Sequence, residues 1–100
     1  MVKLTVLYGH PKDAAAFEMY YAETHMPIAQ KMKGVSRIEL SKVIGAPAGS
    51  KPSYYRTAEL YFESVDHLQS VMGSPEGKAT ADDLANFATG GVTLMISEVA

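Results

Sequence analysis

Tyr21 and His25 are the side chains best suited to acid–base chemistry, and they lie four positions apart. A neutral imidazole accepts a proton near pH 7 and the imidazolium returns it, which suits enolisation, lactone isomerisation, aldol cyclisation or dehydration beside a carbonyl group. On a continuous helix this spacing places both side chains on one face, so that the phenol orients the ring or stabilises a developing oxyanion. We therefore predict His25 as an acid/base and Tyr21 as its partner. A purely structural role for His25, at a helix end ahead of Pro27, is the alternative.

Three further side chains are candidate ligands for a substrate: Tyr8, Tyr54 and Arg56. Tyr8 ends one predicted strand, and the other two begin another. If these strands are antiparallel central neighbours, the end of the first lies beside the start of the second, at one end of a cleft between sheet and helices. Arg56 would then offer a fixed positive charge to a carboxylate or an enolate. Packing is the alternative role of the tyrosines, and a salt bridge that of Arg56.

The spacing of apolar residues predicts the elements that must position these side chains. Alternation with a period of two predicts four strands, over residues 2–8, 35–44, 54–63 and 92–99. Runs that are opened by capping residues predict helices, over residues 14–23, 65–72 and, for a short one, from 81 or 82 to 87. Pro27 disfavours helical geometry at Met26, so the first helix is expected to kink or end near residues 25–27, with a further turn over 28–32.

The resulting order, β-α-β-β-α-β, is typical of the ferredoxin-like class of α+β folds, in which a four-stranded antiparallel sheet carries both helices on one face. We predict one such domain over residues 1–100, because a chain of 100 residues has room for a single core. The cleanest apolar phases of the strands are expected to face the helices, and they include Leu4, Leu40, Leu60 and Leu94.

The other face of the sheet is predicted to carry large apolar and aromatic side chains, namely Leu7, Tyr55, Tyr61, Met95 and Val99. Exposed patches beyond a few hundred Å² usually mark an interface. The chain contains no cysteine, so it cannot gain stability from disulfides, and a second copy of itself is another source of stability for a domain of this size. We therefore predict a homodimer packed sheet to sheet.

Composition and motifs argue against several classes of partner and cofactor. Nine Lys and Arg against eleven Asp and Glu give a net charge of −2, without the basic excess of a nucleic-acid-binding protein. No apolar run approaches the roughly 20 residues that cross a bilayer, and residues 1–8 do not form a signal peptide, so we expect a cytoplasmic chain that starts at Met1 and has no membrane partner.

The sequence also predicts neither a cofactor nor a metal. The glycine pair Gly90-Gly91 lacks the spacing of a nucleotide-binding loop and precedes a strand instead of a helix. None of the three histidines, His10, His25 and His67, is three or four residues from another, and cysteine ligands are absent.

Two segments carry a resemblance to a known family. Tyr21-Ala-Glu-Thr-His25-Met-Pro27-Ile28 stands late in the first predicted helix, followed by Gly34-Val35, and Tyr54-Tyr-Arg-Thr-Ala58-Glu-Leu-Tyr-Phe62-Glu-Ser64 forms the third predicted strand and the start of the next helix. These motifs resemble those of the EthD family in the dimeric α+β barrel superfamily. The resemblance covers most of the chain, and it implies a dimeric α+β barrel that acts on small organic molecules.

The resemblance also bears on activity. Members of this family are associated with bacterial degradation of ethyl tert-butyl ether, and the superfamily includes proteins similar to muconolactone-type isomerases, polyketide cyclases, monooxygenases and dehydratases. We therefore expect cofactor-independent proton transfer, of the isomerase, cyclase or dehydratase type, on a small organic catabolite of ether or aromatic degradation. The alternative is a non-catalytic protein that binds or carries a small molecule and is accessory to a catabolic oxygenase.

Overall fold

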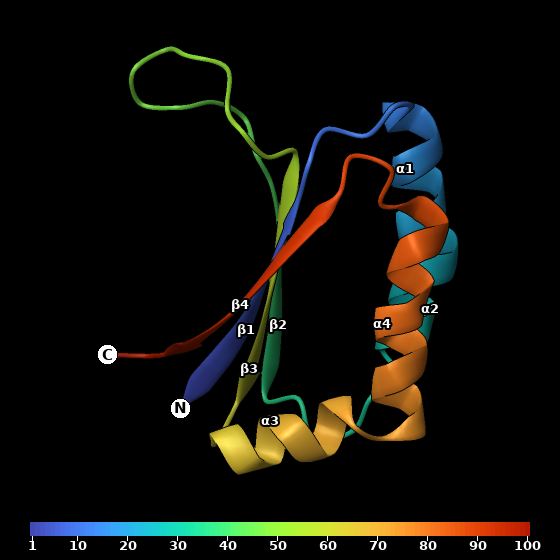
Figure 1. Cartoon of the computed structure of the whole chain (residues 1–100), viewed down its shortest axis with the longest axis vertical. Coiled ribbons are helices and arrows are strands. Elements are labelled where there is room, and N and C mark those ends of the chain that lie inside the picture. Colours follow the sequence, from blue (N-terminus) through green and yellow to red (C-terminus); the bar gives the residue numbers. More distant parts are fainter.

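The computed structural model describes all 100 residues and has the predicted ferredoxin-like α+β fold (Figure 1). Four strands form one antiparallel sheet in the order β2-β3-β1-β4, and their bounds are Val2–Tyr8 (β1), Arg37–Lys42 (β2), Arg56–Phe62 (β3) and Val92–Glu98 (β4). The helical segments are Ala14–Tyr20 (α1), Tyr21–His25 (η1, a π-helical turn), Met26–Ala29 (α2), Val65–Met72 (α3) and Pro75–Phe87 (α4). None of them is long and apolar enough to cross a membrane.

β1 has the predicted bounds, and the other three strands are shorter than expected. β2 pairs with β3 from Arg37 opposite Tyr61 to Lys42 opposite Arg56, and one backbone hydrogen bond extends beyond each end, from Ser36 and from Val43. Alternation reports which side chains face the core, whereas the ends of a strand depend on where its neighbour stops pairing.

The first helix was predicted to kink or end near residues 25–27; it does not end there, and its regular α-helical turns are interrupted just before Pro27 by η1. Asp13 caps it by accepting a hydrogen bond from the N–H of Ala16 at 3.1 Å, and helical backbone then continues through α1, η1 and α2. Within η1 the N–H of Met26 donates to the carbonyl of Tyr21, five residues earlier. This wider turn gives the chain a way to accommodate Pro27 in the first turn of α2 without ending the helix.

The last helix begins at Pro75 and not at residue 81 or 82, so the predicted start was wrong. Gly73-Ser74-Pro75 ends α3, as expected, but it also begins α4: the Ser74 hydroxyl caps the N–H of Gly77 at 3.1 Å, and Pro75 occupies the first turn. Gly77 lies so close to α3 that a Cβ there would stand 2.2 Å from the carbonyl oxygen of Val71. The tight turn between α3 and α4 therefore requires glycine at this position.

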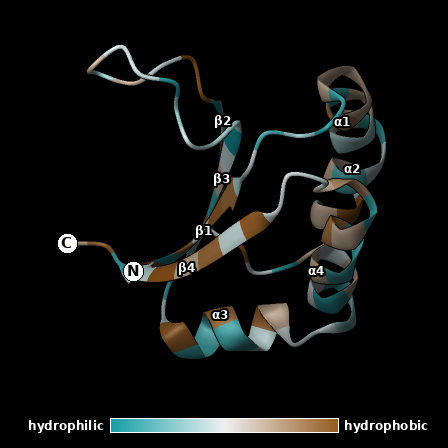
Figure 2. Cartoon of the chain, turned by 45° about the horizontal axis from the view of Figure 1, so that its top comes forward, coloured by the Kyte–Doolittle hydropathy of each residue, from teal (hydrophilic) through white to brown (hydrophobic).

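The core lies between the helices and the two central strands. Leu4 and Val6 of β1 are paired with Leu60 and Ala58 of β3, and all four are buried. The helix-facing residues of the edge strands are more open, with 42% of Leu40, 51% of Leu94 and 57% of Ile96 exposed. Apolar residues of β4 are therefore accessible at the edge of the sheet; Figure 2 shows the hydrophobic segments of β4 in brown.

The uncovered face of the sheet carries one large aromatic side chain fewer than predicted. Tyr55 does not belong to it: the ring packs on Phe17 of α1, with 5.3 Å between centroids, and the hydroxyl donates to Glu18. The Tyr61 hydroxyl lies 2.9 Å from a carboxylate oxygen of Glu39 and 3.0 Å from one of Glu59. Lys3 forms a salt bridge with Glu59 at 3.0 Å, so a charged network surrounds Tyr61.

Candidate functional site

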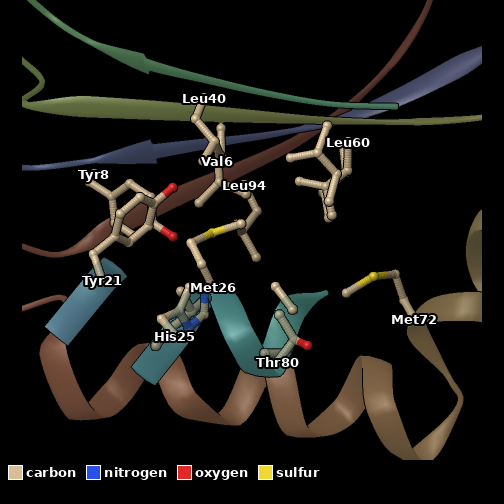
Figure 3. Close-up of a pocket in the computed structure, with 16 residues that line it drawn as sticks. Val6, Tyr8, Tyr21, His25, Met26, Leu40, Leu60, Met72, Thr80 and Leu94 are labelled. Carbon is tan, nitrogen blue, oxygen red and sulfur yellow. The ribbon is translucent and has the colours of Figure 1, made fainter. Parts of the chain in front are cut away.

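An apolar pocket lies between the sheet and the helical layer. It has a volume of about 60 Å³ and is lined by 16 residues, 14 of them hydrophobic, from all four strands and from η1, α2, α3 and α4. Figure 3 shows the strand residues above the pocket and the helical residues below it. No Lys, Arg, Asp or Glu side chain is in its lining, so His25 and the hydroxyls of Tyr8, Tyr21 and Thr80 are the polar groups that a ligand would meet.

His25 lines this pocket and is held by a buried carboxylate. Its Nδ1 lies 2.9 Å from Oδ2 of Asp83 on α4, and both side chains are buried. The His25 ring also stacks on Tyr21, at 5.8 Å between centroids, and contacts Phe87 at 4.6 Å. The imidazole is therefore fixed both in position and in rotation. His25 does not cap a helix end, because the helix continues to Ala29.

Asp83 is itself fixed by two further donors. The hydroxyl of Tyr20 donates to Oδ1 at 2.7 Å, and Nδ2 of Asn86 donates to the same oxygen at 3.0 Å. Burial alone would raise the pKa of Asp83, but the hydrogen bonds from Tyr20, Asn86 and His25 outweigh it and hold this pKa below its ordinary value. Asp83 is therefore ionised at neutral pH.

The ionised carboxylate determines which nitrogen of His25 carries the proton. A carboxylate can only accept hydrogen bonds, so Nδ1 of the neutral ring must be the N–H donor and Nε2 must hold the lone pair. Nε2 has no hydrogen-bond partner in the protein, since the contact with Asp83 is the ring's one side-chain hydrogen bond. Asp83 is outside the pocket lining, which leaves Nε2 as the nitrogen available to a pocket ligand.

Tyr8 and Tyr21 both line the pocket, from β1 and η1. Their rings meet edge to face with 5.6 Å between centroids, and Figure 3 shows their hydroxyl oxygens close together. The Tyr21 hydroxyl is buried and has no hydrogen-bond partner. Burial raises the pKa of both phenols, so both keep their protons at neutral pH.

Arg56 does not line the pocket. Its guanidinium pairs with Glu18 of α1 through two hydrogen bonds, that from Nε measuring 3.3 Å, and it lies 4.9 Å from the centroid of the Tyr21 ring. The hydrogen bond from Arg56 lowers the pKa of Glu18. Arg56 therefore forms a salt bridge, which was its alternative role, and it lies against the Tyr21 ring outside the pocket.

Tyr54 is also outside the pocket. It is half-buried in the segment that precedes β3. The other two histidines bind backbone carbonyls: Nε2 of His10 lies 2.7 Å from that of Pro52, and Nε2 of His67 lies 2.8 Å from that of Gly34. No three His, Cys, Asp or Glu side chains form a group that could hold a metal ion.

Asp83 and Tyr20 are the site residues that the sequence analysis missed. With the last helix predicted to start at residue 81 or 82, Asp83 had the position of an ordinary acidic residue in a first helical turn. On α4 as observed it shares a helix face with Thr80 and Phe87, which are buried. A carboxylate on the buried face of an amphipathic helix is a signal that could have identified it.

The fold and the site together define a small ferredoxin-like α+β protein whose apolar pocket contains a His–Asp pair. Comparison with known proteins agrees with this class and identifies the family within it. The sequence profile described as the EthD domain matches residues 10–91. An uncharacterized 11.0 kDa protein encoded in the thcB-thcC intergenic region of Rhodococcus erythropolis is 41% identical over 98 residues, covering 98% of this chain and 94% of the relative. The chain therefore belongs to the EthD family.

Solved structures support the same assignment. An EthD family protein from Bacillus halodurans superposes with a TM-score of 0.93 at 37% identity, covering 100% of this chain and 99% of the other. A dimeric protein of unknown function and ferredoxin-like fold from Bacteroides fragilis superposes with a TM-score of 0.68 at 14% identity, covering 98% and 95% of the two chains. At that identity the second likeness shows the fold alone.

Proposed function

We propose that the pocket binds a small, largely apolar organic molecule and that His25 moves a proton on a carbon atom beside its carbonyl group. The observation that carries this proposal is the pairing of His25 with buried, ionised Asp83, which leaves Nε2 as an unoccupied base at an apolar pocket. The resemblance to the EthD family supports a small organic catabolite, of the kind met in ether or aromatic degradation, as the substrate.

The proton transfer follows from this geometry. Nε2 takes a proton from the carbon, the C–H bond breaks, and its electron pair moves to the carbonyl oxygen to give an enolate. Asp83 stabilises the imidazolium that forms, because the carboxylate already accepts the hydrogen bond from Nδ1. Tyr21, stacked on His25, is a donor to the enolate oxygen.

The fate of the enolate decides the reaction type. Return of the proton from His25 to a different carbon gives an isomerisation. Attack of the enolate carbon on a second carbonyl, whose oxygen then takes the proton from His25, gives a cyclisation. Departure of a β-hydroxyl group, which takes the proton from His25 and leaves as water, gives a dehydration. All three reactions use the same residues and no external redox partner.

A binding or carrier protein is the second candidate. The observation that favours it is the composition of the pocket lining, in which 14 of 16 residues are hydrophobic. Apolar contacts hold a ligand without changing it, and the methionines Met26 and Met72 can adapt to different shapes. In this case ligand binding would depend on the apolar lining and not on His25.

Hydrogen–deuterium exchange at carbon separates the two candidates. Lactones, β-diketones and hydroxylated aromatics are incubated with the protein in heavy water and examined by NMR. We expect catalysed exchange on at least one class, and a loss of at least about 10²-fold in the rate for His25→Gln. His10→Gln is the matched control, because His10 is exposed, bonds to the Pro52 carbonyl and does not line the pocket. Binding without exchange, unaffected by His25→Gln, would favour the carrier.

We also propose that the protein forms a homodimer through the uncovered face of the sheet. Met95 of β4, opposite Thr5 on this face, is 46% exposed, and Val99 just beyond the strand is 41% exposed. The ferredoxin-like neighbour from Bacteroides fragilis is described as dimeric. The network of Lys3, Glu59 and Tyr61 would lie within such an interface and supply polar contacts beside the apolar ones.

A further inference from the structure

The hydroxyl of Tyr21 is the one buried side-chain polar atom without a hydrogen-bond partner. The residue is 4% exposed and its side chain lines the pocket. Native proteins pair nearly all their buried polar groups, because an unpaired one loses the hydrogen bonds that water gave it in the unfolded chain. A phenylalanine would fill the same space without this cost, so the hydroxyl needs an explanation other than packing.

Tyr8 brings a second hydroxyl to the same place from a different element. Tyr8 is 2% exposed, its ring centroid is 5.6 Å from that of Tyr21, and the two hydroxyl oxygens lie close together in the pocket (Figure 3). A pair of phenols has two O–H hydrogens and can use at most one of them within the pair. At least one donor therefore remains for a group outside the protein.

Both phenols act as donors and not as phenolates. Burial raises the pKa of each, and the proximity of Tyr21 raises that of Tyr8 further. Two neutral O–H groups that converge in an apolar cavity form the arrangement in which an oxyanion is stabilised, since hydrogen bonds to a developing charge are strong where water is excluded.

The charges around the pocket determine which kind of substrate this arrangement accepts. No cationic side chain lines the cavity, and the nearest guanidinium to Tyr21, that of Arg56, is already paired with Glu18. A ligand that arrives as an anion meets the neutral ring of His25, and it loses its hydration without gaining a counter-charge unless His25 also takes up a proton from solvent. A neutral carbonyl compound avoids this loss, because its negative charge appears only when His25 takes its proton and becomes positive.

From these observations we propose that Tyr8 and Tyr21 together form an oxyanion-binding site, and that the pocket therefore selects small neutral ketones or β-dicarbonyl compounds that enolise in place, and rejects carboxylates. This proposal rests on the proposed function of His25 as the base. The reaction is balanced within the site: the C–H proton moves to Nε2, and the electron pair of that bond ends on the oxygen between the two phenols.

The size of the cavity limits the part of the substrate that it can enclose without rearrangement. A volume of about 60 Å³ compares with roughly 10–15 Å³ needed for one water molecule on the same scale. A reacting group of a few non-hydrogen atoms fits this space. Larger substrates need displacement of the flexible side chains of Met26 and Met72, which border the cavity (Figure 3).

Acetylacetone is a suitable probe, because its enolate has a distinct ultraviolet absorption and can be titrated onto the protein. We expect the wild-type protein to bind it as the enolate at a pH below the pKa of the free diketone. Tyr8→Phe and Tyr21→Phe should each weaken enolate binding by about tenfold or more, the scale of one lost hydrogen bond to a charged group. Isovalerate, a carboxylate of similar size, should bind at least about tenfold more weakly than the diketone.

Two controls keep the test specific to the hydroxyls. Tyr54→Phe removes a phenol that is outside the pocket, and it should leave binding unchanged. Thermal unfolding of Tyr21→Phe should show a midpoint equal to or above that of the wild type, because the substitution removes an unpaired buried group. If a variant is as stable as the wild type but binds the ligand more weakly, the loss of binding does not result from misfolding.

The outcomes separate this proposal from the proposed function. If enolate binding depends on both tyrosines but no carbon acid exchanges its protons, the oxyanion site stands and the role of His25 as a catalyst fails. If exchange depends on His25 but both Tyr→Phe variants bind the enolate as the wild type does, the oxyanion site is overturned. Binding of acetylacetone in its neutral form, no binding at all, or tighter binding of isovalerate would overturn it as well.

Discussion

Asp83 is the residue on which the chemistry of the pocket depends, although it does not itself line the pocket. It receives hydrogen bonds from Tyr20, Asn86 and His25 on its two oxygens. This arrangement keeps the carboxylate ionised inside the protein and orients the imidazole so that its basic nitrogen is the free one. Asp83 is therefore a positioning residue, and its effect on catalysis passes through His25.

Substitution of Asp83 by Asn tests this role. An amide can donate to Nδ1 and so favour the tautomer in which Nε2 carries the proton, which removes the base from the pocket. We expect the rate of carbon-acid exchange to fall by about 10²-fold or more, with little change in the affinity for a neutral ligand. An exchange rate within twofold of the wild type would contradict the positioning role.

The pH dependence of the stability of Asp83→Asn tests whether Asp83 is ionised in the folded protein. Its pKa in the folded state is below its ordinary value of 3.8, so the ionised carboxylate stabilises the fold at neutral pH, and this contribution is lost as the pH falls through the folded pKa. In thermal unfolding, the gap between wild type and Asp83→Asn should therefore be largest at neutral pH and should shrink under acidic conditions. A gap independent of pH would contradict the assignment.

At the scale of elements, periodicity predicted which side chains face the core but not where the elements begin and end. Leu4, Val6, Leu60 and Leu94 face the helical layer as expected, because the period-two alternation reports the face of the sheet on which a side chain lies. Tyr55 was assigned to the wrong face: its backbone still bonds to Tyr8 and Val43, but its ring packs on Phe17 of the helical layer.

The helices show why the candidate site could be predicted only in part. Tyr21 and His25 were recognised as a pair at helical spacing, and the structure places both at the pocket. They lie on a common face because helical backbone continues through η1, whereas the local rules for Pro27 left open whether the helix would kink or end. Asp83 was missed because contact between α4 and η1 is a tertiary arrangement, and a helix start placed six or seven residues late concealed the face on which it lies.

At the scale of the whole molecule, the exposed apolar residues of the edge strand lie on both faces of the sheet, and the proposed dimer covers one of these faces. β4 exposes Leu94 and Ile96 on its helix-facing side and Met95 on the other. The pocket also reaches this edge, since Leu94 is part of its lining. A dimer formed through the uncovered face would bury Met95 and leave the helix-facing side of each protomer, with its pocket, intact.

Light scattering tests the dimer. We expect the wild-type protein to be a dimer at micromolar concentration, and Met95→Asp to shift it toward the monomer, because the substitution would bury a charge in the interface. Met19→Asp is the matched control: Met19 is 64% exposed but lies on α1, away from the sheet. A monomeric wild type, or a Met95→Asp variant that dimerises as tightly as the control, would contradict the proposed interface.

The most direct test of the central claim is nitrogen NMR of the His25 ring, since it reports the protonation of each ring nitrogen without requiring the natural substrate. The structure predicts that the neutral ring is protonated on Nδ1 and bare on Nε2, that Asp83→Asn disturbs this preference, and that Nε2 becomes protonated when acetylacetone binds as its enolate. A neutral ring protonated on Nε2 in the wild type, or a ring whose resonances do not respond to a ligand bound in the pocket, would contradict the account.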